Sequence, residues 1–115
     1  MPERGVRVVL VTGPEPATLE TIGRVLVEEQ LAACVNIIPG VTSVYRWEGE
    51  IRADSEALAV IKTTEDCVQA ARLRVAELHP YDVPEFVALE VVEGSPAYLQ
   101  WVRESVATGG GDGQT

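Results

Sequence analysis

Apolar and polar positions along the chain fall into stretches that predict strands and helices. The first apolar run, Val6 to Thr12, is continuous, which is typical of a central strand buried on both faces. From Ala17 to about Gln30 the aliphatic residues recur at helical spacing, with charged residues mostly on the opposite side. Pro16 fits the first position of this helix, because its missing N–H costs nothing there.

A long β-hairpin is predicted next. Leu31–Trp47 and Glu50–Lys62 are rich in residues typical of strands, and Glu48-Gly49 between them predicts a tight turn in which Gly49 takes a positive φ. Pro39-Gly40 predicts a bulge or break in the first arm. Arms of about 15 residues at ~3.3 Å per residue would reach ~50 Å, whereas a small domain is about 30 Å across.

The tip of this hairpin is therefore expected to project beyond its own core. It carries Val44, Tyr45 and Trp47, and apolar residues on a protruding hairpin need a partner surface. We expect the protein to be an oligomer.

The second half of the chain predicts a helix, a strand and a short helix. Thr63 or Thr64 is expected to cap the first of these helices, which should end at His79-Pro80 because the residue before proline avoids helical angles. Glu85–Val92 predicts the last long strand, and Ser95-Pro96 predicts the cap and first turn of a short C-terminal helix. The core stripe of the earlier helix is Val68, Ala71, Val75 and Leu78.

Together these elements predict an α+β fold of the β-α-β-β-α-β type, with a long hairpin and a short C-terminal helix. A chain of 115 residues is expected to form a single domain, which we place at residues 1–106. Residues 107–115 are rich in glycine and predict a flexible C-terminal tail.

The net charge of −9 narrows the classes of partner. Lys62 is the only lysine and His79 the only histidine, so the clustered basic residues that nucleic acids and anionic membranes require are missing. Metal cations, or a partner with a basic surface, remain compatible. Two cysteines make no disulfide framework, and neither a leader-like start nor an apolar run of ~20 residues is present, so we expect a cytoplasmic protein.

The sequence lacks the signatures of common enzymes, including a phosphate-binding loop, a nucleophile elbow and a Cys-x-x-Cys pair. We expect no enzymatic activity. The proline-stiffened segment His79–Glu85 is the main candidate for chemistry, since His79 beside Asp82 and Glu85 could ligate a divalent metal or bind a small ligand. The structural alternative is that His79 simply ends a helix at its negative C-terminus.

Two other side chains have both a chemical and a structural interpretation. Cys34 could be a thiolate ligand for a soft metal such as Cu(I), although a buried, space-filling cysteine is the default. Lys62 could pair with Glu85, Glu90 or a bound anion. A structural role, as a plain ion pair at the end of its strand, is expected about equally. Cys67 lies beside Asp66, away from the apolar stripe, and is expected to be inert.

These segments also carry a family resemblance. Leu31–Gly40 (LAACVNIIPG), followed by Thr42-Ser43-x-Tyr45-x-Trp47-Glu48-Gly49, resembles the CutA divalent-cation-tolerance proteins. Three more segments match in family order and spacing: Ile61–Thr64 (IKTT), His79-Pro80-Tyr81-x-Val83-Pro84-Glu85, and Tyr98-Leu99-x-Trp101. The resemblance runs from about Val8 to Val106.

The resemblance implies a ferredoxin-like fold and a tight homotrimer in which the long hairpin joins sheets across subunits, as in PII signal proteins. It also implies a link to copper and divalent-cation tolerance, with no obligatory cofactor. Some relatives carry a cysteine at the position of Val11 and a histidine at that of Leu78, and neither residue present here can ligate a metal. The remaining candidate ligands are Cys34, His79, Asp82 and Glu85.

Three functions follow as hypotheses. The first is a cytoplasmic homotrimer with a role in metal tolerance and a modest affinity for copper or another divalent cation. The second is a PII-like signalling trimer that binds a small molecule in an inter-subunit pocket lined by Tyr45, Trp47, Lys62, Tyr81 and Glu85. The third is a structural trimer that anchors another protein.

Overall fold

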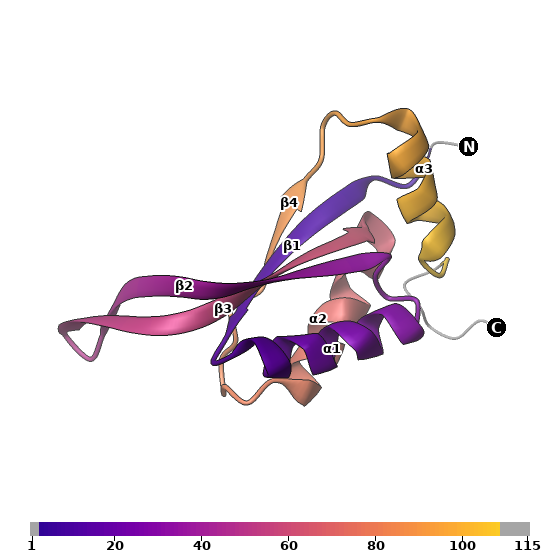
Figure 1. The fold of residues 1–115 in the computed structure, drawn as a ribbon. Helices are drawn as coiled ribbons and strands as arrows, with labels where there is room; N and C mark the ends of the chain where they lie inside the picture. Colours follow the sequence, from indigo (N-terminus) through magenta and orange to yellow (C-terminus); the bar gives the residue numbers. More distant parts are fainter. Residues whose placement is uncertain (1–2, 109–115) are drawn as a thin grey trace.

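The computed structural model describes residues 3–108, which form one four-stranded sheet and three α-helices (Figure 1). The strands are β1 (Val6–Gly13), β2 (Cys34–Trp47), β3 (Glu50–Thr64) and β4 (Val87–Glu90). The helices are α1 (Pro16–Glu28), α2 (Val68–Leu78) and α3 (Pro96–Ser105). The strand order is β2-β3-β1-β4 and all pairs are antiparallel, which confirms the α+β class and the central position of the first strand.

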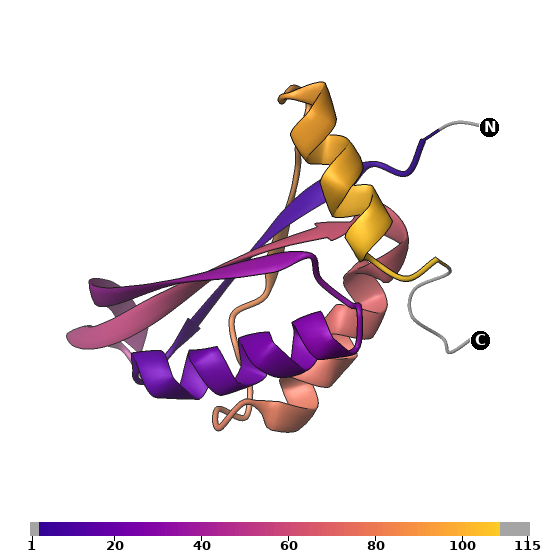
Figure 2. The same cartoon turned by 45° about the vertical axis from the view of Figure 1, so that its right-hand side comes forward.

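Helices α1 and α2 pack on one face of the sheet and enclose the main core (Figure 2). Because side chains alternate along a strand, this face takes the odd-numbered residues of β1 and β3. The largest fully buried side chains here are Leu19, Leu26, Ile61, Val9, Val11 and Val75. Three of the four residues of the stripe predicted for α2 are confirmed, since Ala71 and Val75 are buried in this core and Leu78 packs against it. The fourth, Val68, is half-buried and belongs to neither core cluster.

Helix α3 covers one end of the opposite face of the sheet. Its Val102 packs with Val6, Val106 and Cys67 in a second, smaller core. Cys67 lies outside the α2 stripe but is fully buried in this second core, which keeps its thiol away from solvent. The remainder of this face has no covering element within residues 3–108, and we call it the open face.

The hairpin of β2 and β3 projects from the body of the molecule, as expected (Figure 1). The longest dimension is 49 Å, against 29 and 24 Å for the other two. A register shift between Ile38 and Val41 confirms the bulge at Pro39-Gly40, where Gly40 has a φ of 74°. At the tip both Glu48 (φ 50°) and Gly49 (φ 81°) are left-handed, the arrangement of a type I′ turn.

Several boundaries differ from those predicted, including the start of β2, which is Cys34 and not Leu31. The sheet includes Thr63 and Thr64, because Arg7 and Val6 pair with them, and Thr64 then precedes a single 3₁₀ turn (Glu65–Cys67) without capping it through its side chain. The last strand is only four residues long, since β4 pairs with β1 only between Arg7 and Leu10.

The start of the predicted tail is anchored. Ala107 donates a backbone hydrogen bond to Gln30 at 2.9 Å, and its carbonyl accepts one from Arg4 at 3.0 Å. Residues 109–115, the rest of the predicted tail, lie outside the described residues.

Candidate functional site

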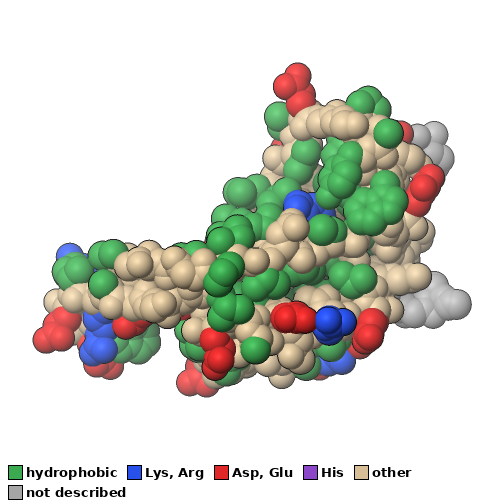
Figure 3. Space-filling view, in the orientation of Figure 1, with side chains coloured by type: hydrophobic (Ala, Val, Ile, Leu, Met, Phe, Trp, Pro, Cys, Tyr) green, Lys and Arg blue, Asp and Glu red, His purple; other side chains and the backbone are tan. Residues whose placement is uncertain are grey.

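The open face carries an apolar surface between two polar ends. The strand register places seven apolar side chains on it: Val8, Leu10, Ile38, Leu58, Val60, Val87 and Leu89. Ile38, Val87 and Leu89 are exposed, and the others are half-buried. Figure 3 shows hydrophobic side chains gathered over the sheet and the C-terminal helix. A contiguous apolar surface of this kind marks an interaction site.

The first polar end surrounds Lys62 and is called the lysine end. The Lys62 ammonium donates a hydrogen bond to Asn36, and Cys34 lies directly across the strand pair from Lys62. Burial, and then the neighbouring Cys34 thiol, raises the pKa of Tyr98, which places the phenol of α3 beside that thiol. Within residues 3–108, Lys62 forms no salt bridge.

The second polar end, called the acidic end, lies where the hairpin leaves the body. Here the phenol of Tyr45 donates to Asp54, and the phenol of Tyr81 donates to Glu56 at 2.7 Å. Burial and the hydrogen bond to Glu56 raise the pKa of Tyr81 to about 12. The hydrogen bond to Asp54 raises the pKa of Tyr45 as well. Both phenols are therefore held as neutral donors to carboxylates.

The turn after α2 supports the acidic end through His79. Its Nδ1 accepts a hydrogen bond from the Tyr81 backbone N–H at 3.1 Å, and a backbone N–H can only donate. The ring proton is therefore on Nε2, which donates to the Thr12 carbonyl at 2.7 Å. His79 is only 7% exposed, and its ring lies 4.7 Å from that of Tyr81. Both ring nitrogens are thus used inside the chain.

The four candidate metal ligands do not form one cluster. Cys34 pairs with Lys62, which pairs with Val8, whereas His79 contacts Thr12, so the two sites are separated by about 13 Å of strand. Among the described residues, no group of three or more His, Cys, Asp or Glu side chains could hold a metal ion. Glu85 lies near His79, since its carboxylate accepts a hydrogen bond from the Thr12 hydroxyl at 3.3 Å. Asp82 is exposed in the turn.

The two positions that depart from the family pattern are structural. Val11 is 1% exposed in the main core, and Leu78 packs against the same core. The main core therefore explains why apolar residues are acceptable at both positions.

The five candidate pocket residues occupy three places in one chain. Tyr45, Tyr81 and Glu85 lie at or beside the acidic end. Lys62 is at the other end of the open face, and Trp47, which is 56% exposed, pairs with Glu50 at the hairpin tip. A pocket made of all five residues would need more than one chain.

Sequence reasoning missed Asp54 and Glu56, which accept the two phenol hydrogen bonds. Their signal was the alternation along β3, where Asp54, Glu56, Leu58, Val60 and Lys62 share one face. This order runs from acidic through apolar to basic.

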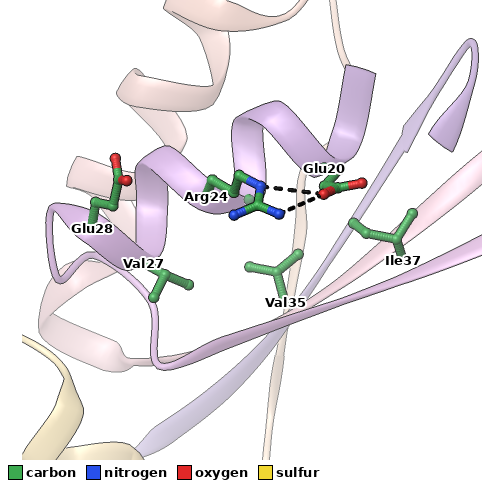
Figure 4. Close-up of a pocket in the computed structure, with 7 residues that line it drawn as sticks. Glu20, Arg24, Val27, Glu28, Val35 and Ile37 are labelled. Atoms are coloured by element: carbon green, nitrogen blue, oxygen red, sulfur yellow. Dashed lines mark hydrogen bonds and ion pairs between the residues drawn. The ribbon is translucent and has the colours of Figure 1, made fainter. Parts of the chain in front are cut away.

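A separate groove of about 320 Å³ lies between α1 and the edge strand β2 (Figure 4). At its base α1 lies close to β2, since a Cβ added at Gly23 would lie 3.1 Å from a Val35 methyl group. Two of its charged side chains are already paired, since Arg24 and Glu20 form an ion pair at 2.9 Å. The groove therefore offers apolar walls and few free polar groups to a ligand.

Comparison with known proteins gives one consistent family. The family model described as the CutA1 divalent ion tolerance protein matches residues 7–105. The Divalent-cation tolerance protein CutA of Thermus thermophilus is 53% identical over 98 residues, which cover 85% of this chain and 95% of that protein. A solved structure of the Thermus thermophilus protein superposes with a TM-score of 0.86 at 51% identity, covering 89% of this chain and 99% of that one.

Other relatives are longer or are named for other compartments. The chloroplastic Protein CutA of Arabidopsis thaliana is 45% identical over 85% of this chain, which spans 54% of that protein. A solved CutA structure from Archaeoglobus fulgidus is titled periplasmic, with a TM-score of 0.85 and 33% identity over 89% of this chain and 99% of that one. No helix within residues 3–108 is long and apolar enough to cross a membrane.

Proposed function

This chain belongs to the CutA1 divalent ion tolerance family, and from this premise we propose that it acts as a cytoplasmic homotrimer in the tolerance of copper and other divalent cations. The family is named for ion tolerance and not for a catalysed reaction, and we propose no enzymatic role. The observation that supports assembly is the open face, whose apolar side chains no element within residues 3–108 covers.

The hairpin supports assembly independently. Val44, Trp47 and Ile51 are 68%, 56% and 63% exposed at its tip, well outside either core. Exposed apolar side chains on a long, projecting hairpin favour burial against another chain. A second copy that covered both the open face and the tip would satisfy both surfaces at once.

Metal binding is proposed to be modest, with His79, Asp82, Glu85 and Cys34 as the candidate ligands. The ligands of one chain do not form a complete metal site, because Cys34 lies far from His79 and both nitrogens of the His79 ring are already hydrogen-bonded. To ligate a metal, the His79 ring would have to give up its bond to Tyr81 N–H or to Thr12. That loss lowers the expected affinity, and the exposed carboxylates of the turn would supply the remaining ligands.

Copper titration of the wild type and of His79→Ala by calorimetry tests this assignment. We expect weak, saturable binding that is reduced at least several-fold in His79→Ala. Asp66→Ala is the control, since its carboxylate lies at the opposite end of β1, near Arg4. Unchanged copper affinity in His79→Ala would show that these ligands are wrong, while leaving the trimer untouched.

The second candidate function is a PII-like trimer that binds a small molecule. It is favoured by the convergence of two phenols on carboxylates at the acidic end, where a neighbouring Trp47 and Lys62 could complete a pocket with Tyr45, Tyr81 and Glu85. Apolar walls with a few convergent polar groups are usual in such sites. Native mass spectrometry of the gently purified assembly would detect a retained small molecule for this function, or a copurified protein for an anchoring trimer.

A further inference from the structure

We propose that Lys62 of one copy pairs with the carboxylate of Glu56 on the next copy, so that the lysine end of each chain docks on the acidic end of its neighbour. This inference rests on the proposed trimer and adds the residues that set its register. It starts from the order of side chains along one face of β3: Asp54, Glu56, Leu58, Val60 and Lys62.

Within one chain, Lys62 at the lysine end is too far from Glu56 at the acidic end to form an ion pair with it. Six positions of β3 separate Glu56 from Lys62, about 20 Å at ~3.3 Å per residue. The Lys62 ammonium donates a hydrogen bond to the neutral amide of Asn36, and none of Lys62, Asp54 and Glu56 forms a salt bridge within residues 3–108. Glu56 is half-buried and already holds the Tyr81 phenol through one oxygen, Oε2, so its orientation is fixed.

When a second copy covers the open face, the Lys62 ammonium has a stronger need for a partner of opposite charge. Lys62 is half-buried beside apolar side chains of β1 and β3, and a second copy would remove more water from its ammonium group. A charge taken out of water without a partner is costly, whereas a partner carboxylate offsets that cost. The acidic end supplies such carboxylates, with Arg52 the cation nearest to them on the same face.

The geometry also fits a closed ring. The two ends are different surfaces of one chain, so a contact between them is head-to-tail, and head-to-tail contacts close into rings when the rotation permits. Each chain of a trimer would then offer its Lys62 to one neighbour and its Glu56 to the other. Every subunit interface would contain one such pair.

A charge exchange within one chain tests the pairing. Lys62→Glu and Glu56→Lys should each weaken assembly by about tenfold or more, because each sets like charges against one another at every interface. The double variant Lys62→Glu/Glu56→Lys should recover most of the wild-type dissociation constant, measured by analytical ultracentrifugation. Since ~20 Å separates the two positions in one chain, recovery requires contact between chains.

The matched control joins Lys62→Glu to Glu28→Lys, which places the same added charge on α1, against the other face of the sheet. This pair should not recover assembly. Circular dichroism of each variant checks its fold. If Lys62→Glu does not fold, Lys62→Gln replaces it in the experiment, because it removes the charge without reversing it. If the wild type is a trimer and the double variant does not recover assembly, the pairing alone is overturned. If the wild type is a monomer, the proposed assembly itself is overturned.

Discussion

Arg4, just before β1, and Arg103, in the last turn of α3, form a clamp by exchanging hydrogen bonds with each other's backbone. The Arg4 guanidinium donates to the Arg103 carbonyl, and Arg103 Nε donates to the Arg4 carbonyl at 2.7 Å. The same guanidinium also reaches the carbonyls of Val106 and Ala107, at 3.2 and 3.0 Å. A cation is thus placed on the unsatisfied carbonyls at the C-terminus of α3, where it is favoured.

Arg4→Met should therefore destabilise the fold by about 1–2 kcal/mol, because several charge-assisted hydrogen bonds to backbone carbonyls are lost together. Urea unfolding followed by circular dichroism measures the effect. Arg24→Met is the matched control, since the Arg24–Glu20 pair lies on the exposed surface of α1 and should contribute less than about 0.5 kcal/mol. Equal losses in the two variants would contradict the clamp.

The raised pKa of Tyr81 predicts that the folded state loses stability at alkaline pH. Its pKa is about 12 in the folded chain against about 10 when unfolded, so between these values the folded state keeps a proton that the unfolded state has lost. The contribution is complete below pH 10 and falls as pH rises toward 12. Tyr81→Phe should make the free energy of unfolding decrease less steeply between pH 10 and 12. An ultraviolet titration should also lose its last tyrosinate step; if that step remains in Tyr81→Phe, another tyrosine carries it.

The hairpin turn predicts a stabilising substitution. Glu48 holds a φ of 50°, which costs free energy for most residues with a side chain but is well tolerated by asparagine. Glu48→Asn would create the Asn-Gly pair that type I′ turns favour, and should raise stability by about 0.5 kcal/mol. Thermal unfolding at fixed protein concentration measures the gain. Glu50→Asn, in the adjoining strand, should give none.

Trp47 tests the role of the hairpin tip in assembly. Trp47→Asp should shift the protein toward monomers, because it would bury a charge where an apolar side chain is proposed to pack. Light scattering at micromolar concentration reports the mass. Leu73→Asp is the matched control, since Leu73 is also 56% exposed but lies on α2, which packs on the other face of the sheet from the open face. If both variants keep the wild-type mass, the tip takes no part in assembly.

The hairpin and the helices could be predicted because their signals are local. Pro39-Gly40, Glu48-Gly49 and Pro16 act through the backbone angles of one or two residues, and each lies where the pattern placed it. The short last strand could not be predicted, because only Arg7–Leu10 of β1 pair with it, and this register is not encoded by its own residues. Apolar character continues through Val91 and Val92, but β1 begins at Val6.

The candidate site was predictable only in part, for a similar reason. The segment His79–Glu85 was found from its prolines and polar groups, and it does support a polar cluster. That both His79 nitrogens are engaged depends on Thr12 and Tyr81, contacts that become visible only when β1 and the turn are placed side by side. Glu56 was missed because its partner, Tyr81, lies 25 residues away along the chain.

The unequal lengths of the strands have one further consequence. The body strand β1 ends at Gly13, opposite Ala57, so the part of the hairpin beyond this pair consists of two strands alone. Isolated two-stranded ribbons are only marginally stable in water. Backbone amides of residues 41–56 should therefore exchange their hydrogens quickly in a lone chain and slowly in an assembled one. Diluting the protein should then speed exchange in the distal hairpin first, and the melting temperature should rise with concentration.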